Sequence, residues 1–263
     1  MNYKLLAADM DGTLLNDDSA LTQRTITALQ AAMDKGVLFV PSTGRPLCAM
    51  EQINTAFSDD LPMILYNGAK VMTGKSNWVL FSQNLDFRCA QEAFAEGVRR
   101  GIPVTAWAGE RLFASDDYES VQSYRAISGM DLTVVADMEP LRELGVTKVL
   151  WIVPNAVRYQ DEMNAYFGGA VNCHASRPYY LEFVDARASK GLALEAVGRH
   201  YGIGPSEMIA LGDGYNDVSM LEYAGLGIAM GNAPEDIKAI CQGVTLSNNE
   251  DGVAEAIERY VLS

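Results

Sequence analysis

Two acidic loops each follow a short, continuously apolar run of the sequence. Asp9 and Asp11 lie in the stretch DMDGTLL, directly after the apolar residues 5–8, and Asp213 lies in GDGYND, directly after residues 208–211. Carboxylates that follow a buried strand are costly unless they have a partner. One such loop could merely cap a turn, but two in one chain favour a shared hard cation with oxygen ligands. A divalent cation would also cancel the repulsion between the carboxylates and keep Asp9 ionised as a nucleophile.

Two further stretches could bind an anion. PSTGR, residues 41–45, follows the apolar residues 37–40, and its backbone amides and the Thr43 hydroxyl could hold phosphate oxygens. Lys190, in the stretch ASKG, is expected at the start of a helix, where the helix dipole disfavours a cation. An anion bound between Lys190 and the other loops would remove this objection. Taken alone, each stretch is also typical of an ordinary turn or of a solvated lysine.

The segments that carry these loops alternate between strands and helices. Three of the four stretches come at the carboxyl ends of expected strands, which is the sheet edge where open α/β proteins bind ligands. The β-α-β-α-β order of residues 5–66 indicates an open parallel sheet with helices on both faces. The expected strands cover residues 5–8, 37–40, 63–66, 208–211, 226–230 and 244–246. The expected helices cover residues 22–35, 48–57, 190–201, 218–224 and 253–261, with another that begins at Pro234.

The middle of the chain follows a different pattern, in which strands come in closer pairs with helices between them. Strands are expected at residues 102–106, 111–114, 148–153 and 181–184, and helices at residues 92–100 and 161–167. This α+β pattern is typical of a second domain. We therefore expect a core made of residues 1–83 and 187–263, and an inserted α+β domain at residues 84–186.

The composition is that of a folded, acidic protein. The 263 residues include 20 Lys and Arg against 34 Asp and Glu, which gives a formal net charge of −14. Such a surface repels nucleic acids and anionic lipids, so a phosphate site needs positive charge concentrated locally. The sequence shows no signal peptide and no apolar run approaching the roughly 20 residues of a membrane helix. We expect a cytoplasmic protein that binds neither nucleic acid nor membrane.

The stretches DMDGTLL, STGR, SKG and GDGYND, in this order, resemble the four motifs of the haloacid dehalogenase (HAD) superfamily. The insertion between the second and third motifs resembles that of the Cof-type, subclass IIB sugar-phosphate phosphatases. The resemblance covers essentially the whole chain. It implies a Rossmann-like core with an inserted cap domain of the C2 type, which would lie over the active site and select the substrate. It also implies hydrolysis of small phosphate esters, with sugar phosphates as the expected class.

The same resemblance implies a role for each motif residue. Asp9 would attack phosphorus and form an aspartyl-phosphate, while Asp11 would protonate the leaving oxygen and then deprotonate the attacking water. Magnesium (Mg2+) would be held by Asp9, the Asp11 carbonyl and Asp213. Asp217 would orient the waters bound to the metal. The residues implied for phosphate binding are Met10, Thr43, Gly44, Lys190 and Asn216.

Three more residues are candidates for contact with the substrate. Arg45 could meet a sugar or a second acidic group, and Asn67 and Gly68 resemble a family position near the substrate. An Asn-Gly pair is also simply a favourable turn. None of these residues identifies the substrate, because superfamily resemblance indicates the reaction far better than the molecule on which it acts.

Two alternatives to a phosphatase stay open. A phosphomutase of the same superfamily would use the same core residues, and Asp11 is compatible with either reaction. The second alternative is a non-catalytic phospho-acceptor or a protein that senses phosphate esters. A domain-sized insertion argues against an acceptor, and the intact set of Asp9, Asp11, Lys190 and Asp213 argues against a sensor.

Overall fold

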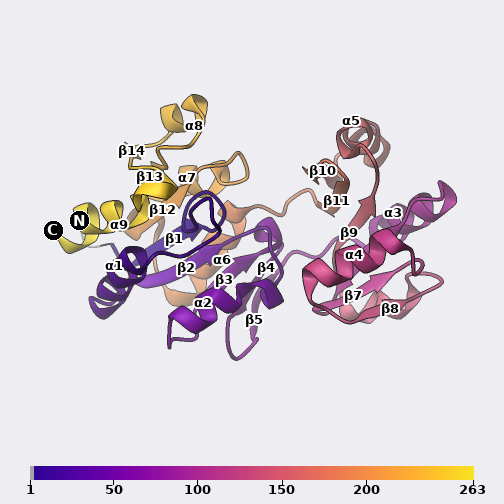
Figure 1. Ribbon diagram of the computed structural model, residues 1–263, viewed down its shortest axis with the longest axis horizontal. Coiled ribbons are helices and arrows are strands. Elements are labelled where there is room, and N and C mark those ends of the chain that lie inside the picture. The colour runs from indigo at the N-terminus through magenta and orange to yellow at the C-terminus, as the bar shows by residue number, and fades with distance from the viewer. Residues whose placement is uncertain (1–2) are drawn as a thin grey trace. The chain divides into compact units, whose positions relative to one another are not determined.

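The computed structural model describes residues 3–263, which form two compact units (Figure 1). The first, called the core unit, comprises the chain up to Arg45, Met50–Phe81 and Ser189–Ser263. The second, called the inserted unit, comprises Pro46–Ala49 and Ser82–Ala188. Every residue predicted for the site lies in the core unit. Among the residues described, no helix has the length and apolar character needed to cross a membrane.

The core unit is built on an eight-stranded sheet in the order β14-β13-β12-β1-β2-β3-β4-β5. The strands from β14 to β3 are parallel, and β4 pairs antiparallel with β3. The predicted α/β class with a parallel-sheet core is confirmed, while β4 and β5 at its edge were not predicted. The strands are β1 (Leu5–Asp9), β2 (Leu38–Ser42), β3 (Pro62–Leu65), β4 (Lys70–Thr73), β5 (Val79–Ser82), β12 (Met208–Gly212), β13 (Leu226–Ala229) and β14 (Gly243–Val244).

Helices cover this sheet because its central strands are apolar on both faces. All five residues of β1 are buried, and Leu5 and Ala7 pack in one cluster with Leu194 of α6. The same cluster includes residues of α7 and α8, whereas α1 contacts β2 and α9. The helices of the core unit are α1 (Gln23–Asp34), α2 (Glu51–Ala56), α6 (Lys190–Tyr201), α7 (Val218–Tyr223), α8 (Glu235–Ile240) and α9 (Gly252–Ile257).

Side-chain caps explain where two of these helices begin. Thr22 caps α1, because its hydroxyl accepts a hydrogen bond from the Thr25 amide at 3.2 Å. Ser189 caps α6 in the same way, accepting from the Leu192 amide at 3.1 Å. The cap on α6 matters for the site, because it makes Lys190 the first residue of that helix.

The inserted unit contains a six-stranded sheet in the order β10-β11-β9-β6-β7-β8. Trp151 of β9 and Phe183 of β11 lie at the centre of its apolar core, with ring centroids 4.8 Å apart. The strands are β6 (Val104–Ala108), β7 (Arg111–Ala114), β8 (Leu132–Val134), β9 (Val146–Ile152), β10 (Val171–Arg177) and β11 (Tyr180–Asp185). The helices are α3 (Phe87–Arg99), α4 (Glu119–Ser128) and α5 (Ala156–Phe167).

Several predicted boundaries were wrong for identifiable reasons. The helix expected at residues 92–100 begins at Phe87, because the Asp86 side chain caps it by accepting from the Arg88 amide at 2.9 Å. The helix expected at residues 48–57 is a 3-10 turn (Leu47–Met50) followed by α2. In the inserted unit, α4, β8 and β10 were not predicted.

Candidate active site

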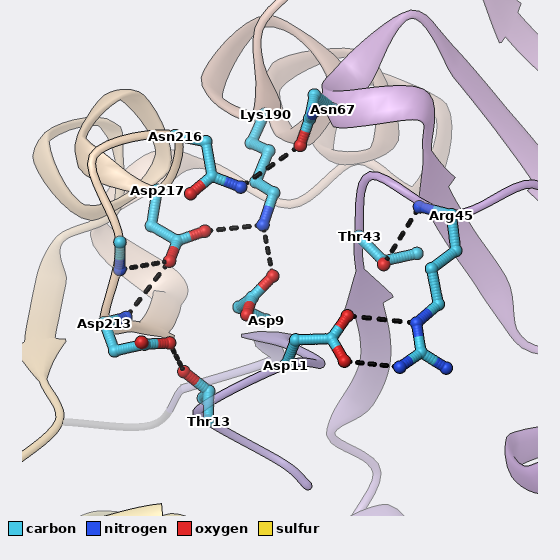
Figure 2. A network of polar contacts seen from close by, with 11 residues as sticks. Asp9, Asp11, Thr13, Thr43, Arg45, Asn67, Lys190, Asp213, Asn216 and Asp217 are labelled. Carbon is cyan, nitrogen blue, oxygen red and sulfur yellow. Dashed lines mark hydrogen bonds and ion pairs between the residues drawn. The ribbon is translucent and has the colours of Figure 1, made fainter. Parts of the chain in front are cut away.

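The register of the central strands brings the predicted loops to one edge of the core sheet. Asp9 at the end of β1 is paired with Ser42 of β2, and Ala8 is paired with Leu211 of β12. Because parallel strands end at the same edge, the loops that follow β1, β2 and β12 meet there. Figure 2 shows side chains of these loops side by side, with Asp9 and Asp217 directed at Lys190.

Three carboxylates from distant parts of the chain come together at this edge. Asp9, Asp213 and Asp217 each offer an oxygen atom, and these atoms lie within 4.8 Å of one another. The ammonium group of Lys190, a residue with 0% exposure, donates a hydrogen bond to Asp9 Oδ1 and another to Asp217 Oδ1 at 2.5 Å. The cluster therefore consists of three carboxylates and one buried lysine.

The charges in this cluster are not balanced. Burial raises the pKa of Asp9, and Asp217 and Asp213 add to the rise, while Lys190 opposes it. Burial also raises the pKa of Asp213. Burial disfavours the charged form of Lys190, but the carboxylates of Asp9 and Asp217 outweigh it and raise the lysine pKa. A surplus of buried carboxylate oxygen fits a hard divalent cation, so these residues could hold a metal ion.

Both carboxylate oxygens of Asp217 already accept hydrogen bonds from the protein. Its Oδ2 accepts hydrogen bonds from the amides of Asp213 at 3.0 Å and Gly214 at 2.9 Å, while its Oδ1 accepts from Lys190. These bonds fix the loop after β12. Asp9 and Asp213 are consequently better placed than Asp217 to offer an oxygen directly to a metal.

Asp11 points away from this cluster. Its carboxylate forms a two-point ion pair with Arg45, in which Arg45 Nε donates to Asp11 Oδ2 at 3.0 Å (Figure 2). The sequence placed Asp11 in the acid–base role and Arg45 against the substrate, and it did not predict that the two pair with each other.

Thr43 and its neighbours form the loop after β2, for which phosphate binding was predicted. Thr43 is buried, and its Oγ1 accepts a hydrogen bond from the Arg45 amide at 3.1 Å. Gly44 lies against Asn67, where an added Cβ would come within 3.0 Å of the amide nitrogen of that side chain. The Met10 side chain is also buried, so this residue can offer only backbone groups to a ligand.

The turn at residues 66–68 ties three of the loops together. Tyr66, Asn67 and Gly68 have φ angles of 51°, 54° and 96°, all in the left-handed region. A Cβ on Gly68 would lie 2.1 Å from the Ser189 carbonyl oxygen, so glycine allows the turn to pack against the start of α6. Asn67 Oδ1 accepts from Asn216 Nδ2 at 3.1 Å, which connects this turn to the loop after β12.

Two polar residues that had no predicted role support the site. Thr13 Oγ1 donates to Asp213 Oδ1 at 2.8 Å, and Asn232 Nδ2 donates to the Gly12 carbonyl at 2.8 Å. Thr13 could have been noticed, because it lies two residues after Asp11 in the first acidic loop. Asn232 carries no such signal in the sequence, since only the folded sheet brings it near residue 12.

Comparisons with known proteins agree with this fold. The chain matches the haloacid dehalogenase-like hydrolases over residues 6–257. It is 31% identical over 279 residues to the protein named "Putative phosphatase YxeH" of Bacillus subtilis (strain 168), with 99% of each chain covered. It is 29% identical over 274 residues to the 5-amino-6-(5-phospho-D-ribitylamino)uracil phosphatase YcsE of the same organism, with 100% of this chain and 97% of that protein covered. Among solved structures, it is 25% identical to the HAD subclass IIB sugar phosphatase BT4131, with a TM-score of 0.81 and 98% of each chain covered.

The protein is thus a hydrolase with a parallel α/β core, whose polar groups gather at the carboxyl edge of the sheet. The chain belongs to the haloacid dehalogenase-like hydrolases, and within that family it is an enzyme of the Cof-type phosphatases. The resemblance based on the four motifs is confirmed.

Proposed function

We propose that this protein is a Mg2+-dependent phosphomonoesterase that hydrolyses small phosphorylated metabolites through an aspartyl-phosphate on Asp9. The observation that carries the proposal is the surplus of carboxylate around Lys190, because it calls for a cation beside the proposed nucleophile. Asp9, Asp213 and the carbonyl of Asp11 are the groups that would hold the metal. Bound there, Mg2+ would neutralise negative charge on the phosphate and on the attacking carboxylate.

The proposed reaction has two half-reactions that share one pair of carboxyl groups. In the first, an Asp9 oxygen attacks phosphorus, the bond from phosphorus to the ester oxygen breaks, and Asp11 gives that oxygen its proton. In the second, Asp11 takes a proton from a water molecule, the water oxygen attacks phosphorus, and the Asp9 carboxylate is released with inorganic phosphate. Asp11 thereby regains the proton that it lost.

The remaining loop residues hold the transferring phosphoryl group. The Thr43 hydroxyl accepts from the Arg45 amide, which leaves its own proton available for a phosphate oxygen. Lys190 supplies positive charge from the start of α6, where an anion also benefits from the helix N-terminus. We assign the same task to Asn216 and to the amides of Met10 and Gly44, and assign Asp217 to orienting metal-bound water.

For the substrate we propose a phosphorylated sugar or polyol. YcsE is named for a phosphoribityl compound and BT4131 as a sugar phosphatase, so both names describe a phosphate on a polyhydroxylated chain. We further propose that residues 84–186 act as the cap that selects the substrate, with Asn67 and Gly68 contributing from the core unit. A cytoplasmic location is consistent with the free thiols of Cys48, Cys89, Cys173 and Cys241.

The test is a screen of the purified protein against phosphorylated sugars, polyols and nucleotides, with Mg2+ or with EDTA. We expect release of inorganic phosphate that EDTA abolishes, and an Asp11→Asn variant slower by on the order of 100-fold or more. Asp18→Asn, which changes an exposed aspartate on the same loop, is the matched control and should keep the wild-type rate. Full activity in EDTA or in Asp11→Asn would refute the mechanism, and an isomeric sugar phosphate in place of free phosphate would indicate a mutase.

A further inference from the structure

Arg45 binds Asp11 through two nitrogen atoms of its guanidinium group. Nε donates to Asp11 Oδ2 at 3.0 Å, and a terminal nitrogen donates to Asp11 Oδ1. Two parallel hydrogen bonds fix both the plane and the direction of a carboxylate, which a single contact does not. In Figure 2 the Asp11 carboxylate points toward Arg45, whereas the Asp9 carboxylate points toward Lys190.

The two partners differ in how firmly the rest of the core unit holds them. The Arg45 amide donates to Thr43 Oγ1 at 3.1 Å, and the Arg45 carbonyl accepts from the Tyr66 amide at 3.2 Å. The backbone of Arg45 is therefore anchored on both sides. The Asp11 side chain is 59% exposed, so packing alone leaves its direction open. Arg45, whose side chain is 34% exposed, is therefore the more buried of the two partners and has an anchored backbone.

Stability does not explain this pair. Ion pairs between exposed side chains contribute about 0–1 kcal/mol to folding, because water and salt screen them. The core unit contains a second pair of the same form, in which Arg24 Nε and a terminal nitrogen donate to the two Glu258 carboxylate oxygens at 3.4 and 2.9 Å. Arg24 and Glu258 are 46% and 49% exposed, so this pair is a close match for Arg45 and Asp11 without the neighbouring site.

We propose that Arg45 is a positioning residue, whose guanidinium fixes the direction in which the Asp11 carboxylate enters the reaction. The inference rests on the proposed acid–base role of Asp11. It also differs from the sequence-based expectation, in which Arg45 contacts the substrate itself. Through Thr43, the same arginine links the phosphate loop to the acid–base loop, so the two would be placed together.

The experiment compares Arg45→Ala and Arg45→Lys, each with Asp11 and with Asp11→Asn. In the presence of Asp11, we expect Arg45→Ala to lower kcat by roughly 10- to 100-fold with little change in KM, the usual effect of misplacing a reacting group. Arg45→Lys should recover only part of this loss, because a point charge cannot hold both oxygens. In the Asp11→Asn background, Arg45→Ala should change kcat little. Arg24→Ala should leave kcat unchanged, and the melting temperatures of both alanine variants should stay close to that of the wild type.

Other outcomes separate the possible failures. If Arg45→Ala raises KM and leaves kcat unchanged, Arg45 contacts the substrate and the inference is wrong. An equal loss of kcat with and without the Asp11→Asn change would also refute it, because the effect would not pass through Asp11. If Asp11→Asn alone keeps the wild-type rate, the proposed function fails first.

Discussion

Each unit of the molecule contains a buried lysine that is paired with carboxylate, one in the inserted unit and several in the core unit, and the two clusters differ in their charge balance. In the inserted unit, Lys148 of β9 donates to Glu182 Oε1 on the neighbouring strand β11 at 3.0 Å. In the core unit, Lys190 contacts Asp9 and Asp217, with Asp213 close by. Both lysines are almost fully buried, but they differ in the number of carboxylates close to them.

In the inserted unit, the charges of the buried pair balance each other. Ser176 Oγ donates to Glu182 Oε1 at 2.9 Å, and His174 Nε2 lies 3.8 Å from Glu182 Oε2. Burial acts to raise the pKa of Glu182, but Lys148, His174 and Ser176 outweigh it and hold that pKa below its usual value. The pKa of Lys148 is raised despite its burial, chiefly by Glu182. Each buried charge thus has its counter-charge.

The cluster in the core unit behaves in the opposite way. There the pKa of Asp9 is raised, because burial and two neighbouring carboxylates outweigh the lysine. Burial and neighbouring carboxylates both raise a carboxyl pKa, and here the one lysine does not offset them. A buried lysine alone therefore does not indicate an active site. An excess of carboxylates over positive charges around the lysine does.

The largest expected effect is the loss of enzymatic activity when Asp9 of the core-unit cluster is replaced. Asp9→Asn should lower kcat by about 10⁴-fold or more, because it removes the proposed nucleophile. Its free energy of unfolding, measured without metal by urea denaturation, should fall by no more than about 1 kcal/mol, since the change removes one of several crowded negative charges. The phosphoenzyme, sought by rapid acid quench with labelled substrate, should be absent. A variant that keeps its activity would remove Asp9 from the mechanism.

The second prediction concerns stability in the inserted unit. Glu182→Gln should lower the free energy of unfolding by about 3 kcal/mol or more, because it leaves the charge of Lys148 buried without its partner. Glu139→Gln is the matched control: it breaks an exposed pair with Arg142 and should cost less than about 1 kcal/mol. Equal losses in the two variants would show that the buried pair contributes no more to the free energy of unfolding than the exposed pair.

The residues of the core site were predictable from sequence because short-range signals mark them. The apolar runs that became β1, β2 and β12 are buried on both faces, and such runs suit the centre of a parallel sheet. The loop residues follow those runs directly. The contacts between the loops were not predictable, since Asp11 with Arg45 and Thr13 with Asp213 depend on how the folded strands align.

The inserted unit was predicted less well for a physical reason. The strand β10, with the sequence VNCHASR, lies at a sheet edge, and although its apolar and polar residues alternate, its apolar side chains after Val171 are small. The pairing of Lys148 with Glu182 joins residues on separate strands, so no local pattern indicates it. A charged residue inside each of two otherwise apolar strands was nevertheless a usable signal, because buried charges occur mainly in pairs.

The third prediction tests whether the core-unit cluster around Lys190 lacks positive charge. With Mg2+ at about 100 times its dissociation constant, the free energy of unfolding of the wild type should rise by about 2.7 kcal/mol. Asp213→Asn should abolish this rise, since it removes a proposed ligand, while Glu182→Gln should show it in full from a lower starting point. An undiminished rise in Asp213→Asn would place the metal elsewhere.

The smallest expected effect is the dependence of stability on pH that comes from Glu182. Its pKa is lower in the folded chain than in the unfolded chain, so between the two values the unfolded state binds more protons. The stabilisation is therefore complete above the unfolded pKa of about 4.5 and is lost as the pH falls through the lower, folded pKa. Urea denaturation from pH 6 downward should show a steeper loss for the wild type than for a Lys148→Met/Glu182→Leu double variant, which lacks both charges. Parallel curves for the two proteins would mean that Glu182 titrates alike in the folded and unfolded states, and that the balance inferred for this cluster is wrong.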